Sequence, residues 1–202
     1  MLFNQSFIRY FRSSLLILSF LGAVCSAQTP LNIQQSTAMD DIKLTVKELG
    51  WMDKSHMEKE VEKVNQLAQL KLGMQLHRDL SDLNLLQLLV DKNWVKNEDV
   101  VLQQAMGIAL GNIMLADFPN TLEWKIYEDN LGRSRAVCAK GTKECMFPVT
   151  MIQRRMQIGT RPDMQKLYDT AIMRMEKFLP QIPYGGGILH KLHTDSYSTA
   201  PQ

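Results

Sequence analysis

Apolar residues recur at helical spacing along the first half of the chain. Within residues 32–52, Ile42, Val46 and Leu49 form one stripe that ends at Gly50, which predicts a helix. Ser55 and Glu58 have the spacing of a capping box, so a second helix is expected over 55–73. A third is expected over 79–93. The inward positions of these two helices are Met57, Val61, Val64, Ala68, Leu83, Leu86 and Val90.

The segment 97–118 differs because its apolar residues cover nearly the whole circumference of a helix. A helix of this kind is a buried central helix, and we expect 97–116 to be the most buried element. Gly107 and Gly111 lie four residues apart within it. Glycine costs about 1 kcal/mol against alanine inside a helix. We therefore expect a close approach by a neighbouring element, and a ligand contact is the less favoured alternative.

After Pro119, apolar and polar residues alternate along the chain instead of recurring at helical spacing. Leu122, Trp124 and Ile126 alternate with polar residues, which predicts a strand over 121–130. Two more strands are expected over 133–140 and 143–149, completing a three-stranded antiparallel meander.

Helical spacing then returns. A short basic helix is expected over 150–159, with Arg154 and Arg155. An amphipathic helix is expected over 162–179, punctuated by Pro162 and Pro180.

The predicted fold class is α+β. It has a helical N-terminal part (31–93), a buried central helix packed on the small meander, and a C-terminal amphipathic helix. We expect one α+β domain over 28–182 and a flexible tail over 183–202, which carries a triple glycine and polar residues.

The first 27 residues have the order of a secretory signal peptide: two arginines, an apolar run, then small residues. Ala27 and Cys25 suit the small subsites of signal peptidase, so cleavage is expected after Ala27. Two alternatives remain open, acylation of Cys25 as a lipoprotein and an uncleaved anchor. The sequence predicts a periplasmic or secreted protein with no stable membrane insertion after cleavage.

Two cysteines remain after that cleavage. If Gly141 and Thr142 form a two-residue hairpin loop, Cys138 faces Cys145 within disulfide reach. Export favours oxidation, so we expect a structural disulfide. A redox role is less favoured because the spacing is not CxxC.

Composition narrows the function classes. The chain has 23 Lys and Arg against 21 Asp and Glu, and its predicted leader holds two arginines and no acid. The remaining balance gives no reason to expect nucleic-acid binding. No metal or other cofactor is expected: zinc spacing is absent, and the HxxH of His190 and His193 lies in the predicted tail.

The second half of the chain resembles an uncharacterised bacterial family, the domain of unknown function 3806, over about residues 60–180. The motifs that carry the resemblance are Gly107, Gly111, Trp124, Gly132, Pro148 and the pair Arg154-Arg155, and its most similar part is 97–180. The resemblance implies a small α+β domain and no activity.

Two functions are compatible with this sequence. The first is a non-catalytic binding module for a protein partner, such as an inhibitor or immunity protein, and no catalytic residue is assigned. The alternative is a cell-envelope enzyme with a site near Trp124, Arg154 and Arg155, since adjacent arginines can grip a carboxylate or phosphate. These three residues are the candidate binding surface in either case.

Overall fold

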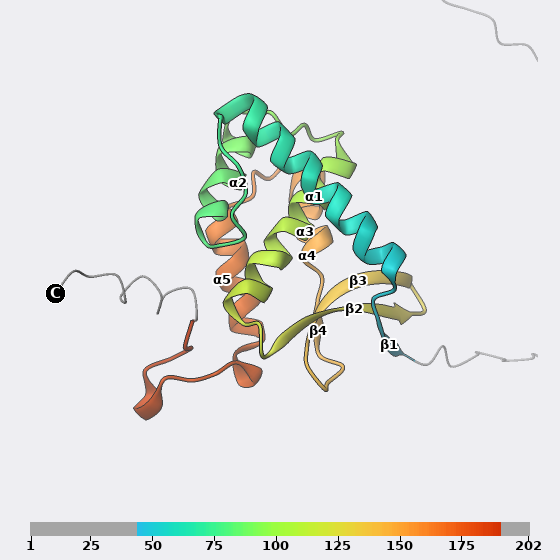
Figure 1. Ribbon diagram of the computed structural model, residues 1–202, viewed down its shortest axis with the longest axis vertical. Helices are drawn as coiled ribbons and strands as arrows, with labels where there is room; N and C mark the ends of the chain where they lie inside the picture. Colours follow the sequence, from blue (N-terminus) through green and yellow to red (C-terminus); the bar gives the residue numbers. More distant parts are fainter. Residues whose placement is uncertain (1–43, 191–202) are drawn as a thin grey trace, which may run out of the picture. The chain divides into compact units, whose positions relative to one another are not determined.

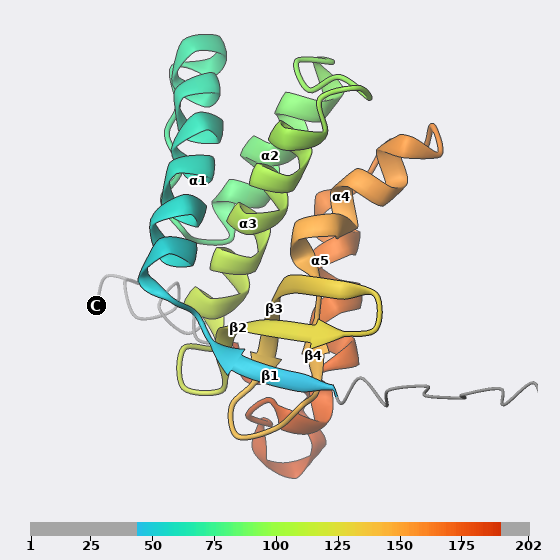
Figure 2. The same ribbon diagram turned by 90° about the vertical axis from the view of Figure 1, so that its right-hand side faces the viewer.

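The structure is a computed structural model, and it describes residues 44–190. The described elements, in chain order, are β1 (Thr45–Glu48), α1 (Trp51–Leu72), α2 (Ser81–Asp91), α3 (Val100–Asp117), β2 (Leu122–Asp129), β3 (Gly132–Ala139), β4 (Cys145–Met146), α4 (Pro148–Gln157) and α5 (Met164–Arg174), followed by two short 3-10 turns. The sheet lies across one end of the helices (Figures 1 and 2). The predicted α+β class is confirmed.

The sheet is antiparallel with the order β1-β2-β3-β4. The predicted meander is present as β2, β3 and β4, although β4 is only two residues long because α4 already begins at Pro148. The fourth strand, β1, corrects the helix predicted over 32–52, of which residues up to 43 lie outside the described part. Val46 and Leu49 alone do not make a helical face, and β2 offers β1 a backbone ladder from Thr45↔Glu128 to Glu48↔Lys125.

Helix α1 begins at Trp51 rather than Ser55, so the predicted capping box is wrong. Its N-cap is Gly50, which has an extended backbone and no side-chain hydrogen bond. Asp53 in the first turn binds the β2–β3 hairpin instead, through Arg133 at 2.6 Å and Arg135 at 3.0 Å. The Arg133 hydrogen bond, aided by Arg135, holds the pKa of the Asp53 carboxyl below its usual value. This contact fixes the start of α1 to the sheet.

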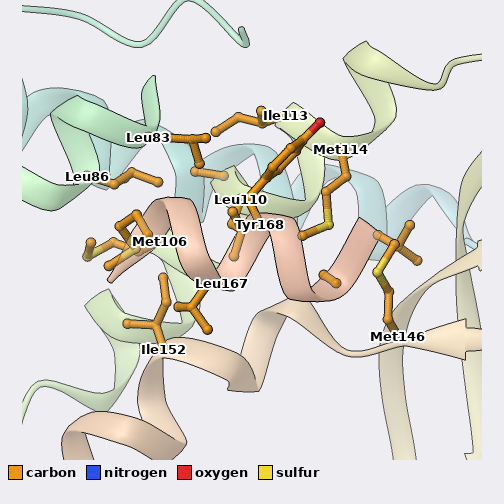
Figure 3. Close-up of a cluster of buried hydrophobic side chains, with 14 of the residues drawn as sticks. Leu83, Leu86, Met106, Leu110, Ile113, Met114, Met146, Ile152, Leu167 and Tyr168 are labelled. Atoms are coloured by element: carbon orange, nitrogen blue, oxygen red, sulfur yellow. The ribbon is translucent and has the colours of Figure 1, made fainter. Parts of the chain in front are cut away.

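Helix α3 is the centre of the core, as predicted, and most of its residues are buried. It is also the one described helix whose length and composition would suit a membrane span, but its burial inside the fold is that of a core helix. Figure 3 shows the cluster around it, to which α2, α3, α4, α5 and β4 contribute side chains. The buried residues drawn there include Leu83, Leu86, Met106, Leu110, Ile113, Met114, Met146, Ile152, Leu167 and Tyr168.

The two glycines of α3 allow close packing on one side of the helix. A Cβ on Gly107 would lie 2.4 Å from the carbonyl oxygen of Pro148 and 2.7 Å from Cα of Val149. A Cβ on Gly111 would lie 2.3 Å from Cζ2 of Trp124. The packing interpretation of both glycines is confirmed: Gly107 admits the start of α4, and Gly111 admits the indole ring.

Part of the predicted flexible tail packs against the core. Residues 181–188 form a small loop closed by the bridge Gln181↔Ile188. Beyond it, Nδ1 of His190 lies 2.5 Å from Oδ2 of Asp117, which also accepts a hydrogen bond from the Tyr168 hydroxyl. Burial, reinforced by that hydrogen bond, raises the pKa of Tyr168 far above its usual value, so the neutral hydroxyl donates to the carboxylate. Residues 191–202, the rest of the predicted tail, and His193 with them, lie outside the described part.

Candidate functional site

Helices α4 and α5 enclose a hollow of about 460 Å³ that carries three arginines, here called the arginine hollow. Arg154 and Arg155 come from the last turn of α4, and Arg174 is the last residue of α5. The apolar part of its lining includes Phe147, Met151, Leu167, Ala171 and Met175. Cys145 and Glu144 close the end nearest the sheet.

The arginine hollow has an excess of positive charge. No described carboxylate lies within ion-pair distance of Arg154, Arg155 or Arg174, and the one bond recorded for these guanidinium groups runs from Nη1 of Arg155 to the carbonyl oxygen of Met151, at 2.9 Å. The acid in the lining, Glu144, is 3.8 Å from Lys177. The hollow therefore suits an anionic group.

The arginines stand at opposite ends of this hollow. The connection 158–163 returns the chain so that α5 runs back toward the sheet beside α4 (Figure 2). Arg174 lies at the sheet end, since Lys177, three residues further on, is 3.8 Å from Glu144 next to β4. Arg154 lies in the last turn of α4, the end away from β4. From Leu167 to Arg174 a helix rises about 10 Å, so one small anion does not reach both ends.

A second and larger hollow of about 660 Å³, here called the tryptophan cleft, lies between α1, α3 and β2. Trp124 of β2 forms part of its wall, and the indole N–H donates to Oδ1 of Asn112 at 3.0 Å. The apolar lining includes Leu49, Met57, Val61, Leu115, Leu122 and Trp124. Charged side chains surround it: Glu48, Lys54, Glu58, Arg78, Glu123 and Lys140.

The structure does not bring the three predicted surface residues into one site. Trp124 is bonded to Asn112, whereas Gln153, the residue before Arg154, accepts from Gln104 of the same helix at 2.8 Å. Asn112 and Gln104 are eight residues apart, or about 12 Å along α3. Within the described residues, the two hollows share no lining residue.

The predicted disulfide between Cys138 and Cys145 is present, and the two residues are paired across β3 and β4 as the register argument expected. The turn beside it differs slightly from a two-residue loop. Thr142 donates its N–H to the carbonyl oxygen of Ala139, and Lys140 donates its own to Thr121. Cys138 is fully buried in the sheet, which favours a structural bond over a redox one.

Two candidate site residues, Arg174 and Arg78, could not be recognised from the sequence. Arg174 is one of many cations at helix ends, and only the packing of α5 beside α4 brings it to the arginine hollow. Arg78 lies in a loop with a positive φ of 62°, and its N–H donates to Oδ2 of Asp82 at 2.7 Å. Burial raises the pKa of Asp82, but its other oxygen also accepts a backbone N–H, from His77, so this acid holds the loop.

The described residues contain no group of three or more His, Cys, Asp or Glu side chains placed to hold a metal ion. The described residues thus form an α+β domain in which the arginine hollow and the tryptophan cleft are separate.

Comparison with known proteins confirms the family resemblance. A family model described as domain of unknown function (DUF3806) matches residues 82–168, from α2 into α5. The match is shorter than the expected 60–180, and it includes Trp124, Arg154 and Arg155 but not Arg174. No curated protein matches the chain.

A similar solved structure is a crystal structure from Bacteroides thetaiotaomicron VPI-5482, with a TM-score of 0.58 and 17% sequence identity. The alignment covers 64% of this chain and 47% of that one, so this chain spans about half of its length. At this identity the likeness shows a shared fold alone.

Proposed function

We propose that this protein is an exported, non-catalytic binding module that holds an acidic segment of a partner protein in the arginine hollow. The observation that carries the proposal is that Arg154, Arg155 and Arg174 line one hollow and that no described carboxylate lies within ion-pair distance of them. Guanidinium groups bind carboxylates through paired hydrogen bonds and are weakly hydrated, so they suit protein interfaces.

The spacing of the arginines favours a polypeptide over a small anion. About 10 Å separates the two ends of the hollow, and about three residues of extended chain cover that distance. Acidic side chains at the two ends of such a segment would meet Arg154 and Arg174. Between them, Met151 and Leu167 offer apolar contact to the residues in the middle.

Export is supported by two features. The first 27 residues have the order of a signal peptide, and the disulfide of Cys138 and Cys145 suits an oxidising compartment. The intact mass of the protein recovered from the cell envelope or medium tests this part. A chain starting at Gln28 is expected, and a retained leader or a lipid-modified Cys25 would contradict it.

The enzyme alternative has less support because its site would need Trp124 beside Arg154 and Arg155, and Trp124 lines a different hollow. The buried acid Asp82, whose perturbed pKa would suit catalysis, uses both oxygens for backbone hydrogen bonds. We therefore propose binding.

The binding proposal is tested by capture from an envelope extract, with the wild-type chain and the double variant Arg154→Ala with Arg155→Ala as baits. A matched control removes two cations elsewhere, through Arg161→Ala with Lys166→Ala, both exposed and outside the arginine hollow. The expected result is a partner retained by the wild type and the control and lost by the double variant, with unchanged melting. Equal retention by all three, or a double variant that does not fold, would refute the proposal.

A further inference from the structure

The tryptophan cleft has the size and lining of a small-molecule site. Its volume of about 660 Å³ falls within the ~300–1,000 Å³ common for ligand pockets. Such pockets combine a mostly apolar wall with a few placed polar groups. Here α1, α3 and β2 supply the wall, and the loop after α1 supplies Arg78.

We propose that the tryptophan cleft binds a small amphiphilic carboxylate, an anion with one carboxylate and an apolar body. This site is separate from the arginine hollow, and the inference does not depend on the function proposed above.

Asn112 and Arg78 form the anchor for the carboxylate. The indole N–H of Trp124 can only donate, so the Asn112 atom that meets it at 3.0 Å is the amide oxygen. The amide nitrogen of Asn112 consequently points away from Trp124, and no hydrogen bond to a described residue uses it. Both Asn112 and Arg78 also line a small adjoining hollow of about 100 Å³, which places them at the common border.

The charge of Arg78 is available to a ligand. No described carboxylate lies within ion-pair distance of its guanidinium group, because the neighbouring acid Asp82 is bonded to the backbone of the same loop. That bond also holds Arg78 at a positive φ of 62°. Residues other than glycine rarely adopt this conformation, and those that do are found more often at functional sites.

The other charges around the cleft largely cancel. Lys125 pairs with Glu123 at 3.0 Å and also with Glu48. Lys140 donates to the carbonyl oxygen of Pro119 at 2.8 Å. Lys54 and Glu58 are one helical turn apart on α1 and carry opposite charges, so together they add no net charge to the cleft. The guanidinium of Arg78 is therefore the charge that an anionic ligand neutralises.

The apolar wall selects the body of the ligand. Met57 and Val61 of α1 face Leu115 of α3 and Trp124 of β2 around the same space. Methionine and tryptophan adapt to flexible alkyl or aromatic groups. A purely polar anion would leave this wall in contact with water, so the proposal requires both parts of the ligand.

The test is a calorimetric titration of the folded protein with sodium decanoate, with 1-decanol as the uncharged match. The expected result is saturable binding of decanoate at one site, about tenfold or more tighter than that of decanol, since a hydrogen bond to a charged group adds about 1.5–3 kcal/mol. Absence of saturation, or equal affinity for the two probes, would overturn the proposal.

Variants locate the site. Arg78→Gln keeps the backbone bond to Asp82 and is expected to weaken decanoate about tenfold without changing decanol. Ala116→Phe fills the cleft from α3 and is expected to abolish binding of both probes. This variant tests whether the probes bind in the tryptophan cleft even if Arg78→Gln does not fold. Lys166→Gln, which removes an exposed cation outside both hollows, serves as the control and should leave decanoate binding unchanged. Equal decanoate affinity in the wild type and Ala116→Phe would place the binding elsewhere.

Discussion

Replacing Gly107 with alanine changes the stability of the protein through two opposing effects, helix propensity and steric overlap with α4. Alanine is favoured over glycine inside a helix by about 1 kcal/mol, so propensity alone predicts a more stable protein. The structure predicts the opposite. The new Cβ would lie 2.4 Å from the carbonyl oxygen of Pro148 and 2.7 Å from Cα of Val149, below the 3.0 Å that Cβ atoms essentially never breach.

The size of the stability loss depends on which atoms must move to make room for the new Cβ. The obstructing atoms at Gly107 belong to the backbone at the start of α4, so the helix itself has to shift away from α3. Overpacking of a close-packed contact costs about 1–3 kcal/mol, and a helix displacement belongs at the upper end. Subtracting the propensity gain leaves a net loss of about 2 kcal/mol. For a domain of this size that loss lowers the melting temperature by roughly 4–8 °C.

Urea unfolding followed by far-ultraviolet circular dichroism measures this difference. The Gly107→Ala variant should unfold at a lower urea concentration with an unchanged m-value, because the unfolded surface is the same. A variant as stable as the wild type, or more stable, would show that α4 does not approach α3 at Gly107.

Four further outcomes follow from the same structure. Gly111→Leu should destabilise by several kcal/mol, since its side chain takes the space of the Trp124 ring; a melting temperature within a degree or two of wild type would contradict this. Asp53→Asn should cost about 1–2 kcal/mol near neutral pH. Arg133 and Arg135 lower the pKa of the Asp53 carboxyl in the folded protein below 3.8. The contribution of Asp53 to stability is therefore fully present above its pKa in the unfolded chain and is lost as the pH falls through its lower pKa in the folded protein. The free energies of unfolding of wild type and variant should converge only in that acid range. Reduction of the Cys138–Cys145 bond should cost about 2 kcal/mol, because the loop it closes is short, and thermal melts with and without dithiothreitol should differ accordingly. Tyr168→Phe should cost about 1–3 kcal/mol by removing a donor from the buried Asp117 carboxylate; a neutral result would mean that another donor replaces the phenol.

Local pattern was sufficient for the centre of this fold. The all-round apolar helix α3, its two glycines and the register of Cys138 with Cys145 were predicted because each depends on residues close in sequence. The class α+β followed from them. The amphipathic α5 was predicted for the same reason, and in the structure Met164, Tyr168 and Ala171 are buried on one of its faces.

Features that depend on distant partners were not predictable in this way. Strand β1 exists because β2 lies beside it, and nothing within 44–50 specifies that neighbour. The sequence suggested one surface for Trp124, Arg154 and Arg155, but the direction of α4 along α3 sends the indole and the arginines to different hollows. Arg174 joins the arginine pair only through the return of α5.

The most direct test of the central claim is a calorimetric titration of an oligoglutamate peptide into the wild-type protein and into a triple variant, Arg154→Ala, Arg155→Ala and Arg174→Ala. The account predicts saturable binding to the wild type that weakens with added salt and is lost in a triple variant that still melts cooperatively. Equal binding by the two proteins, or no binding by the wild type at low salt, would contradict a role for the arginine hollow in holding an acidic segment.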